Sequence, residues 1–173
     1  ALFHNNVDDK RLSWFADNGA TDHMTFDHTS FVSYTKFIEP KSVRVGNDAV
    51  ILAYGSGCIN IEMCVNGKLF PAFITDVWYV PELRDNLFSL IVAEMKGYRI
   101  NAENSQIQLI RNDIVVGTGV RDGKSLYKMN LRVITPDEPA AVYLTDAVEP
   151  KNEKLQFWHE RLCHQNKQHV KEF

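Results

Sequence analysis

The chain has 173 residues, of which 45% are hydrophobic and 11% aromatic, and its formal net charge is −3. This composition is typical of a globular chain that is long enough to bury the core of one domain. An acidic balance, with no basic run longer than two residues, argues against a primary nucleic-acid-binding role. No apolar stretch approaches the roughly 20 residues that a membrane-spanning helix needs.

The three cysteines are Cys58, Cys64 and Cys163. An odd and sparse set does not make a disulfide framework, so we expect an intracellular, reducing compartment. Cys58 and Cys64 fall on apolar-patterned strands, where a thiol behaves as a small hydrophobic side chain. Neither has a histidine at a spacing that indicates a catalytic pair, so a cysteine peptidase is not expected.

From Ser13 to about Val133, short apolar-patterned runs separated by turn residues predict an all-β barrel or sandwich. The alternation is clearest in residues 59–65, where the odd positions are apolar. Asn66-Gly67 is a strong two-residue hairpin signal, and residues 111–113 and 121–124 are further hairpin tips. The predicted strands are Leu12–Ala16, Ser42–Val45, Val50–Ala53, Cys58–Val65, Lys68–Val80, Tyr98–Asn101, Gln106–Ile110, Ile114–Val120 and Leu126–Leu131.

One helix is predicted in this region, from Leu87 to about Lys96, with Gly97 at the position that ends it. After Val133 the composition changes to a proline-containing, acidic segment that is typical of a linker. Within it, Ala140–Leu144 could dock as an extra edge strand. A basic, histidine-containing segment from Leu155 to Phe173 predicts a helical tail. The expected division is therefore an arm (1–12), a β domain (13–133), a linker (134–154) and a tail (155–173).

The first predicted strand ends in the sequence Asp17-Asn18-Gly19-Ala20. A carboxylate that leaves a buried strand and enters a tight turn suits a carboxyl group that faces a second carboxyl and shares one proton with it. The alternative is an Asx-turn, in which Asp17 bonds only to its own loop. The tetrapeptide alone leaves both interpretations open.

Three blocks of the chain resemble the polyproteins of copia-type LTR retrotransposons. Residues 14–25, WFADNGATDHMT, resemble the active-site block of their protease. Residues 76–90, DVWYVPELRDNLFSL, are similar to the second signature block, and residues 157–164, FWHERLCH, to the start of the segment that opens the integrase. This resemblance implies a retroviral-protease-like closed β-barrel with one short helix, followed by the start of the pre-integrase zinc region.

The resemblance makes Asp17 the catalytic residue and Asn18, Gly19 and Ala20 the active-site loop. The chain has one such block, so an acid dyad requires a homodimer in which each copy donates Asp17. One carboxylate then acts as general base on a water, and no cofactor is needed. The family usually has Ser or Thr at the position of Asn18. An amide also donates and accepts hydrogen bonds but is one atom longer, so the network between the two loops is either kept with shifted loops or weakened.

A hairpin at Val43–Ile51 matches the place of the family's mobile flap, with Gly46, Asn47 and Asp48 at its tip and Gly55-Ser56-Gly57 as a candidate hinge. An ordinary surface hairpin is the alternative. Leu87, Phe88 and Ser89 match a loop that packs beneath the catalytic turn and supports Asp17. If Leu87 and Phe88 are only core residues, they are expected to lie in nearly the same place.

His159 and His164 resemble the two histidines of the integrase zinc module. A structural zinc site needs four ligands, and Cys163 takes the place of a small residue in that motif. A spacing of five residues also turns a helix by about 140°, which separates the two rings. We therefore expect no metal in this chain, only half of an incomplete zinc site. Three lone histidines, His4, His23 and His28, are expected at the surface.

The function that follows is an aspartic endopeptidase that processes its own Gag-Pol polyprotein inside a cytoplasmic virus-like particle. Its partners would be a second copy and a peptide substrate bound as an extended strand, with no membrane and no nucleic acid. One alternative is a catalytically silent or domesticated β-barrel interaction module. Another is a zinc-dependent nucleic-acid module, which would need further cysteines and a basic face.

Overall fold

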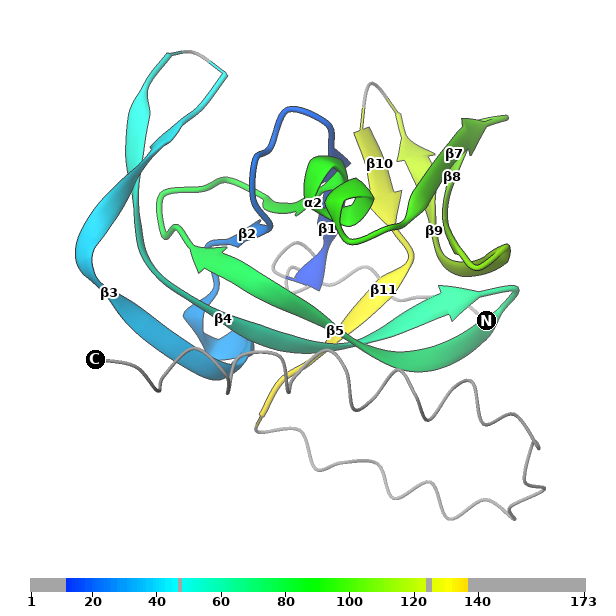
Figure 1. Ribbon diagram of the computed structural model, residues 1–173, viewed down its shortest axis with the longest axis horizontal. Helices are drawn as coiled ribbons and strands as arrows, with labels where there is room; N and C mark the ends of the chain where they lie inside the picture. The colour runs from blue at the N-terminus through cyan, green and yellow to red at the C-terminus, as the bar shows by residue number, and fades with distance from the viewer. Residues whose placement is uncertain (1–11, 47, 124–125, 137–173) are drawn as a thin grey trace. The chain divides into compact units, whose positions relative to one another are not determined.

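The computed structural model describes residues 12–46, 48–123 and 126–136, and within them the chain is built from strands with one α-helix and one short 3-10 helix. The predicted all-β class is confirmed (Figure 1). The strands are β1 (Trp14–Asp17), β2 (Met24–Thr25), β3 (Phe31–Arg44), β4 (Val50–Val65), β5 (Lys68–Tyr79), β6 (Asn86–Ser89), β7 (Arg99–Glu103), β8 (Gln106–Arg111), β9 (Ile114–Asp122), β10 (Leu126–Met129) and β11 (Leu131–Ile134). The helices are η1 (His28–Ser30) and α2 (Leu90–Met95).

The strands form one sheet in the order β11-β4-β5-β2-β6-β1-β10-β9-β8-β7, and β3 is a further partner of β4. Within the described residues this path does not close, so the expected closed barrel is corrected to an open sheet. Two hydrogen bonds join Cys64 of β4 to Thr118 of β9 and to Asn130, the residue before β11. The Thr118 hydroxyl donates to the Cys64 carbonyl at 2.8 Å, and the Cys64 amide donates to the Asn130 carbonyl at 2.7 Å.

The core lies where β1, β4 and β5 meet β8 to β11. The alternation predicted for residues 59–65 is confirmed, because Ile59, Ile61, Met63 and Val65 are all buried. Each such side chain stabilises the fold by about 1.5–3 kcal/mol. Glu62 is buried on the opposite face of β4, where Arg132 of β11 approaches its Oε2 at 2.8 Å. The larger members of the core are Trp14, Phe31, Ile59, Ile61, Val77, Phe88, Ile107, Leu109 and Met129.

Local turn signals are confirmed at the hairpin tips. Asn66 and Gly67 have φ values of 51° and 74°, the left-handed pair that a tight hairpin with this dipeptide requires. Asn112 and Asp113 adopt the same region at 50° and 60° between β8 and β9. Gly97 follows α2 with φ 85°, and its amide donates to the Glu94 carbonyl at 2.8 Å.

The predicted helix is too long at its start. Residues 86–89 pair with β1 as the parallel strand β6, and the helix begins only at Leu90. Ser89 marks the change, since its backbone is extended and its hydroxyl accepts a hydrogen bond from the Val92 amide at 3.1 Å. A serine in this position satisfies one of the free amides of the first helical turn.

The candidate hinge Gly55-Ser56-Gly57 is part of a regular strand. These residues lie inside β4, which runs unbroken through the two strands predicted on either side, and they pair with both β3 and β5. A Cβ atom at Gly57 would overlap the Ser33 carbonyl, and one at Gly55 would overlap the Tyr34 ring. The glycines therefore allow β3 to approach β4 closely.

Residues 1–11 of the predicted arm (1–12), the tip residue Asn47, residues 124 and 125, and the chain after Pro136 lie outside the described residues. The linker, the segment Ala140–Leu144 and the helical tail therefore remain predictions. In the part of the chain that is described, no helix is both long and apolar enough to cross a membrane.

Candidate active site

Strand β1 places Asp17 at its carboxyl end. Trp14 and Ala16 are buried, while Phe15 and Asp17 point to the less buried side. The Gly19 amide donates to Asp17 Oδ1 at 2.7 Å. A Cβ atom at Gly19 would lie 3.3 Å from the same oxygen, so a larger residue would crowd the carboxylate.

This short bond is expected both in an Asx-turn and in a loop that holds a carboxylate in position for catalysis. The two interpretations differ in what the second oxygen does. Among the described residues, Oδ2 of Asp17 has no hydrogen-bond donor. Asn18 and Gly19 are both exposed, so the turn presents the carboxylate at the surface of a single chain.

Strand β6 supports the turn from within the sheet. It runs parallel to β1, with Phe15 opposite Leu87, Ala16 opposite Phe88 and Asp17 opposite Ser89. The three residues predicted to lie beside the catalytic turn are therefore brought there. They form a strand rather than the expected loop, because their backbone groups pair with β1 on one side and with β2 at Met24 on the other.

Ser89 links three parts of the site and is fully buried. Its hydroxyl donates to the Ala20 carbonyl at 2.6 Å and accepts from the Val92 amide. Its own amide donates to Nδ1 of His23 at 3.0 Å. The segment between β1 and β2, which contains the candidate active-site turn, is thus tied to β6 at both Ala20 and His23.

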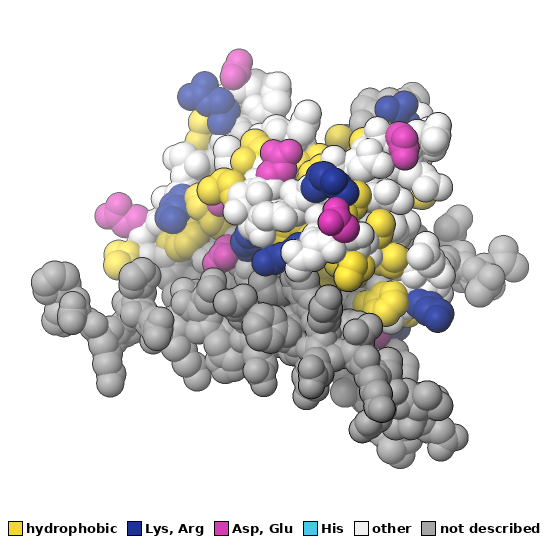
Figure 2. Space-filling model, turned by 45° about the vertical axis from the view of Figure 1, so that its right-hand side comes forward, with side chains coloured by type: hydrophobic (Ala, Val, Ile, Leu, Met, Phe, Trp, Pro, Cys, Tyr) yellow, Lys and Arg dark blue, Asp and Glu magenta, His cyan; other side chains and the backbone are white. Residues whose placement is uncertain are grey.

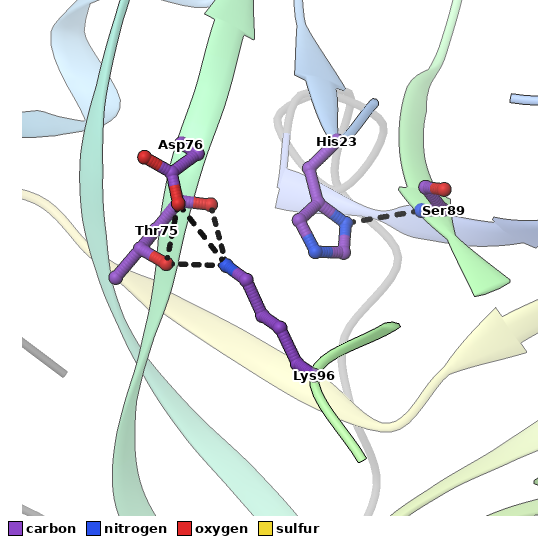
Figure 3. A network of polar contacts seen from close by, with 5 residues as sticks. All are labelled: His23, Thr75, Asp76, Ser89 and Lys96. Atoms are coloured by element: carbon purple, nitrogen blue, oxygen red, sulfur yellow. Dashed lines mark hydrogen bonds and ion pairs between the residues drawn. The ribbon is translucent and has the colours of Figure 1, made fainter. Parts of the chain in front are cut away.

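His23 was expected at the surface, and this expectation is wrong. Its side chain is only 3% exposed, and its ring lies 4.6 Å from that of Phe88 between centroids. Burial lowers the pKa of His23 from 6.5 to about 3, and the charge of Lys96 acts in the same direction. The imidazole is therefore neutral near pH 7, with Nδ1 free of a proton so that it can accept from Ser89 (Figure 3).

In Figure 3, Asp76 and the amino group of Lys96 lie on the side of His23 opposite Ser89. Lys96 Nζ contacts Thr75 Oγ1 at 2.5 Å and Asp76 Oδ2 at 3.2 Å. Asp76 has φ 59° at a bulge where two residues of β5 lie opposite one of β4. Beyond the bulge, β5 turns to pair with β2, and the Trp78 amide donates to the His23 carbonyl at 2.8 Å.

A second network of buried hydrogen bonds joins the strands around the turn. Thr25 Oγ1 donates to Asn86 Oδ1 at 2.7 Å, and Asn86 Nδ2 donates to the Ser13 carbonyl at 2.9 Å. These bonds join β2, β6 and the start of β1. Thr25 and Asn86 were not among the predicted site residues, because a buried Thr–Asn pair 61 residues apart has no local signature.

The predicted flap is a hairpin formed by the ends of β3 and β4. Arg44 and Val50 make its last cross-strand pair, and the Asp48 amide donates to the Val45 carbonyl at 2.9 Å across the tip. Asp48 has φ 62°, whereas Gly46 has ordinary negative φ and open space around it. The hairpin projects toward the same edge of the view as the segment that joins β1 to β2 (Figure 1).

A small apolar cluster anchors this hairpin to the strands that carry the active-site turn. Its buried members are Met24, Val43, Ala53 and Val80, and the partly buried side chain of Leu87 packs against them. The stem of the hairpin is thus held by β2, β5 and β6. Its tip extends beyond these contacts.

Charges of both signs are distributed over the face seen in Figure 2, where Lys or Arg side chains lie close to Asp or Glu side chains. At the flap, for example, Arg44 lies 3.8 Å from Asp48 with both side chains largely exposed. On this face, the described residues form no patch of one sign. Among the described residues, no group of three or more His, Cys, Asp or Glu side chains could hold a metal ion, and His159 and His164 lie outside them.

Comparison with known proteins gives consistent matches. Residues 14–98 match the family described as the β-barrel domain of Pol polyproteins. The chain is 29% identical over 151 residues to a retrovirus-related Pol polyprotein from transposon TNT 1-94 of Nicotiana tabacum, covering 87% of this chain and 10% of that protein. It is 22% identical over 153 residues to one from transposon RE1 of Arabidopsis thaliana, covering 88% of this chain and 10% of that protein.

A third relative is the putative transposon Ty5-1 protein YCL075W of Saccharomyces cerevisiae, 37% identical over 82 residues, which are 47% of this chain and 49% of that protein. The chain thus spans about a tenth of the length of the two Pol polyproteins that it matches. No solved structure matches it.

Proposed function

The chain belongs to the Pol polyproteins of copia-type retrotransposons, and from this premise we propose that it is an aspartic endopeptidase, active as a homodimer, that processes the Gag-Pol polyprotein. The observation that carries the proposal is the setting of Asp17. The carboxylate stands at the end of a buried strand, one oxygen is held by the Gly19 amide at 2.7 Å, and β6 lies directly beside it.

The proposed mechanism needs two copies of Asp17, one from each chain. Two carboxyl groups about 3 Å apart hold one proton between them. The ionised group takes a proton from a water between the pair, and the protonated group polarises the carbonyl of the peptide bond that is cut. The exposure of Asn18 and Gly19 supports this arrangement, because the turns of two copies can meet only if they are free of their own chain.

The substrate is proposed to be an extended peptide that binds between the β3–β4 hairpin and the active-site turn and is read by alternating side-chain pockets. The anchored stem and unanchored tip of that hairpin support its role as a flap. No cofactor, membrane or nucleic acid takes part in this proposal, and the setting is a cytoplasmic virus-like particle.

The decisive test is incubation of the chain with the polyprotein segments that flank it, with and without the change Asp17→Asn. The amide keeps the size of the carboxyl group but cannot act as a general base, so cleavage should be abolished while the circular dichroism spectrum stays the same. Asp113→Asn at the exposed tip between β8 and β9 is the matched control, and it should still cleave. Turnover by the Asp17→Asn variant would exclude an aspartic mechanism. A folded wild-type chain that never cleaves would instead indicate the silent interaction module.

A further inference from the structure

We propose that His23 is a positioning residue for Asp17: its neutral imidazole holds the active-site turn on β6, and its protonation releases that turn and sets the acid limit of the enzyme. This inference rests on the proposed function and extends it. It concerns a side chain that does not touch the substrate and that acts through Ser89.

The first step is geometric. The turn leaves β1 at Asp17 and returns to the sheet at β2, so its shape depends on where it is fastened. Ser89 provides both fastenings, through its hydroxyl to the Ala20 carbonyl at 2.6 Å and through its amide to His23 Nδ1 at 3.0 Å. Since Ser89 is also the residue opposite Asp17, these bonds fix the turn relative to the carboxylate.

The second step concerns the donor and the acceptor. The Ser89 amide is buried and can only donate, so His23 must offer Nδ1 without a proton. A protonated imidazole would place an N–H opposite that amide, which removes the bond and leaves two donors facing each other. A positive charge would also be buried beside the Phe88 ring, 4.6 Å away.

The third step is the charge around the ring. Lys96, which follows α2, disfavours a second positive charge, while Asp76 on β5 favours it. Lys96 and Asp76 are themselves paired at 3.2 Å, so their effects on His23 largely oppose each other. On its own segment, Asp22 precedes His23 and accepts a hydrogen bond from Thr21 at 2.9 Å. Burial therefore remains the main reason that the imidazole stays neutral.

The pH dependence follows from these groups. The pKa of His23 is lowered in the folded turn from 6.5 to about 3. Between pH 3 and pH 6.5, the protein with a released turn therefore binds one more proton than the protein with a folded turn. The contribution of His23 is complete above pH 6.5 and is lost progressively as the pH falls toward 3. An acid dyad works in this range, so the same acidity that suits the dyad loosens the turn that carries it.

The experiment compares three variants in the whole chain. His23→Asn places an amide oxygen where Nδ1 lies and cannot titrate, whereas His23→Leu fills the site without an acceptor. His28→Gln is the control, because His28 is exposed and its ring lies against Tyr34 and Tyr79. The measurements are kcat and KM from pH 3 to 8, and the ¹H–¹⁵N shifts of the Gly19 and Ser89 amides, which report the turn without any cleavage.

Above pH 6.5, His23→Leu should lower kcat about tenfold with little change in KM, as expected for one lost hydrogen bond, and should shift both amides. Its kcat should approach that of the wild type as the pH falls toward 3, because the wild-type imidazole then loses the same bond. His23→Asn should recover most of that rate, and its activity should decline at a lower pH than that of the wild type. His28→Gln should follow the wild type throughout. The inference is overturned if His23→Leu keeps both amide shifts and the wild-type kcat, or if the acid limb is the same in His23→Asn. Loss of the proposed function looks different, since wild type and Asp17→Asn would then be equally inactive.

Discussion

Ser89 lies opposite Asp17 in the parallel pair of β1 and β6, and its hydroxyl reaches across to the Ala20 carbonyl in the turn that follows. The same hydroxyl caps α2 through the Val92 amide. One buried side chain thus joins the candidate catalytic turn, its neighbouring strand and the only α-helix of the described residues.

Ser89→Ala should therefore destabilise the fold more than an ordinary serine substitution. It removes a helix cap and leaves a buried carbonyl without its donor, each of which costs about 1–2 kcal/mol. Chemical denaturation gives the free energy of unfolding directly. Ser33→Ala on the exposed part of β3 is the control and should change it by less than about 0.5 kcal/mol. Equal effects in the two variants would show that the Ser89 hydroxyl does not stabilise the turn.

Gly57→Ala tests why β4 contains glycines where a hinge was expected. The added Cβ would overlap the Ser33 carbonyl, so β3 has to move away from β4, and a loss of about 2–3 kcal/mol or more is expected. Gly46→Ala is the matched control, because nothing lies within 4 Å of a Cβ there and its φ is ordinary. A thermal melt distinguishes the variants. A hinge role predicts a different result, in which Gly57→Ala slows cleavage and leaves the melting temperature unchanged.

The parts of the fold that were predictable from the sequence are those with local signals. The alternation of residues 59–65, the dipeptide Asn66-Gly67 and the stop at Gly97 each act within a few residues. Two short strands beside the candidate site, β2 and β6, were missed. They have two and four residues, and most of their side chains are buried, so no alternation marks them. Their formation depends on pairing with β1 and β5, which is not visible locally.

The candidate site shows the same division. The strand end followed by glycine left an Asx-turn open for Asp17, and the resemblance alone assigned its role and the place of Leu87, Phe88 and Ser89. The burial of His23 was not foreseen, because a lone histidine in a sequence is more often exposed. Its environment is created by Ser89 and Phe88, 66 and 65 residues further along the chain. Only the tertiary fold turns this histidine into an obligatory acceptor.

Asn18→Ser tests whether an amide is the best side chain between two meeting turns. The exposed Asn18 is expected to bond to the second copy, and a hydroxyl is shorter while keeping both donor and acceptor. The dimer should be as strong or stronger, and the cleavage rate equal or higher. Both quantities follow from activity measured over a dilution series, because the active fraction depends on assembly. A large loss in both would mean that the neighbouring residues are adjusted to Asn18.

The last prediction concerns the chain after the sheet. Strand β11 ends at Ile134, and its pairing with β4 runs from Leu131 opposite Met63 to Ile134 opposite Asn60. A chain that ends at Pro136 keeps this ladder, so it should retain its melting temperature and its cleavage activity. A shorter chain that ends at Asn130 is the control. It loses β11 and the Arg132 partner of the buried Glu62, and it should be destabilised by about 3 kcal/mol or more.

The full chain and the chain that ends at Pro136 also test the zinc expectation for His159 and His164. Two histidines supply half of the ligands of a structural zinc site. Elemental analysis of the full 173-residue chain should therefore find clearly less than one zinc per molecule, with no difference from the chain that ends at Pro136. Stoichiometric zinc in the longer chain alone would show that Cys163 or a second copy completes the site. Unfolding of the Pro136 chain would show that residues such as Ala140–Leu144 add a strand to the sheet.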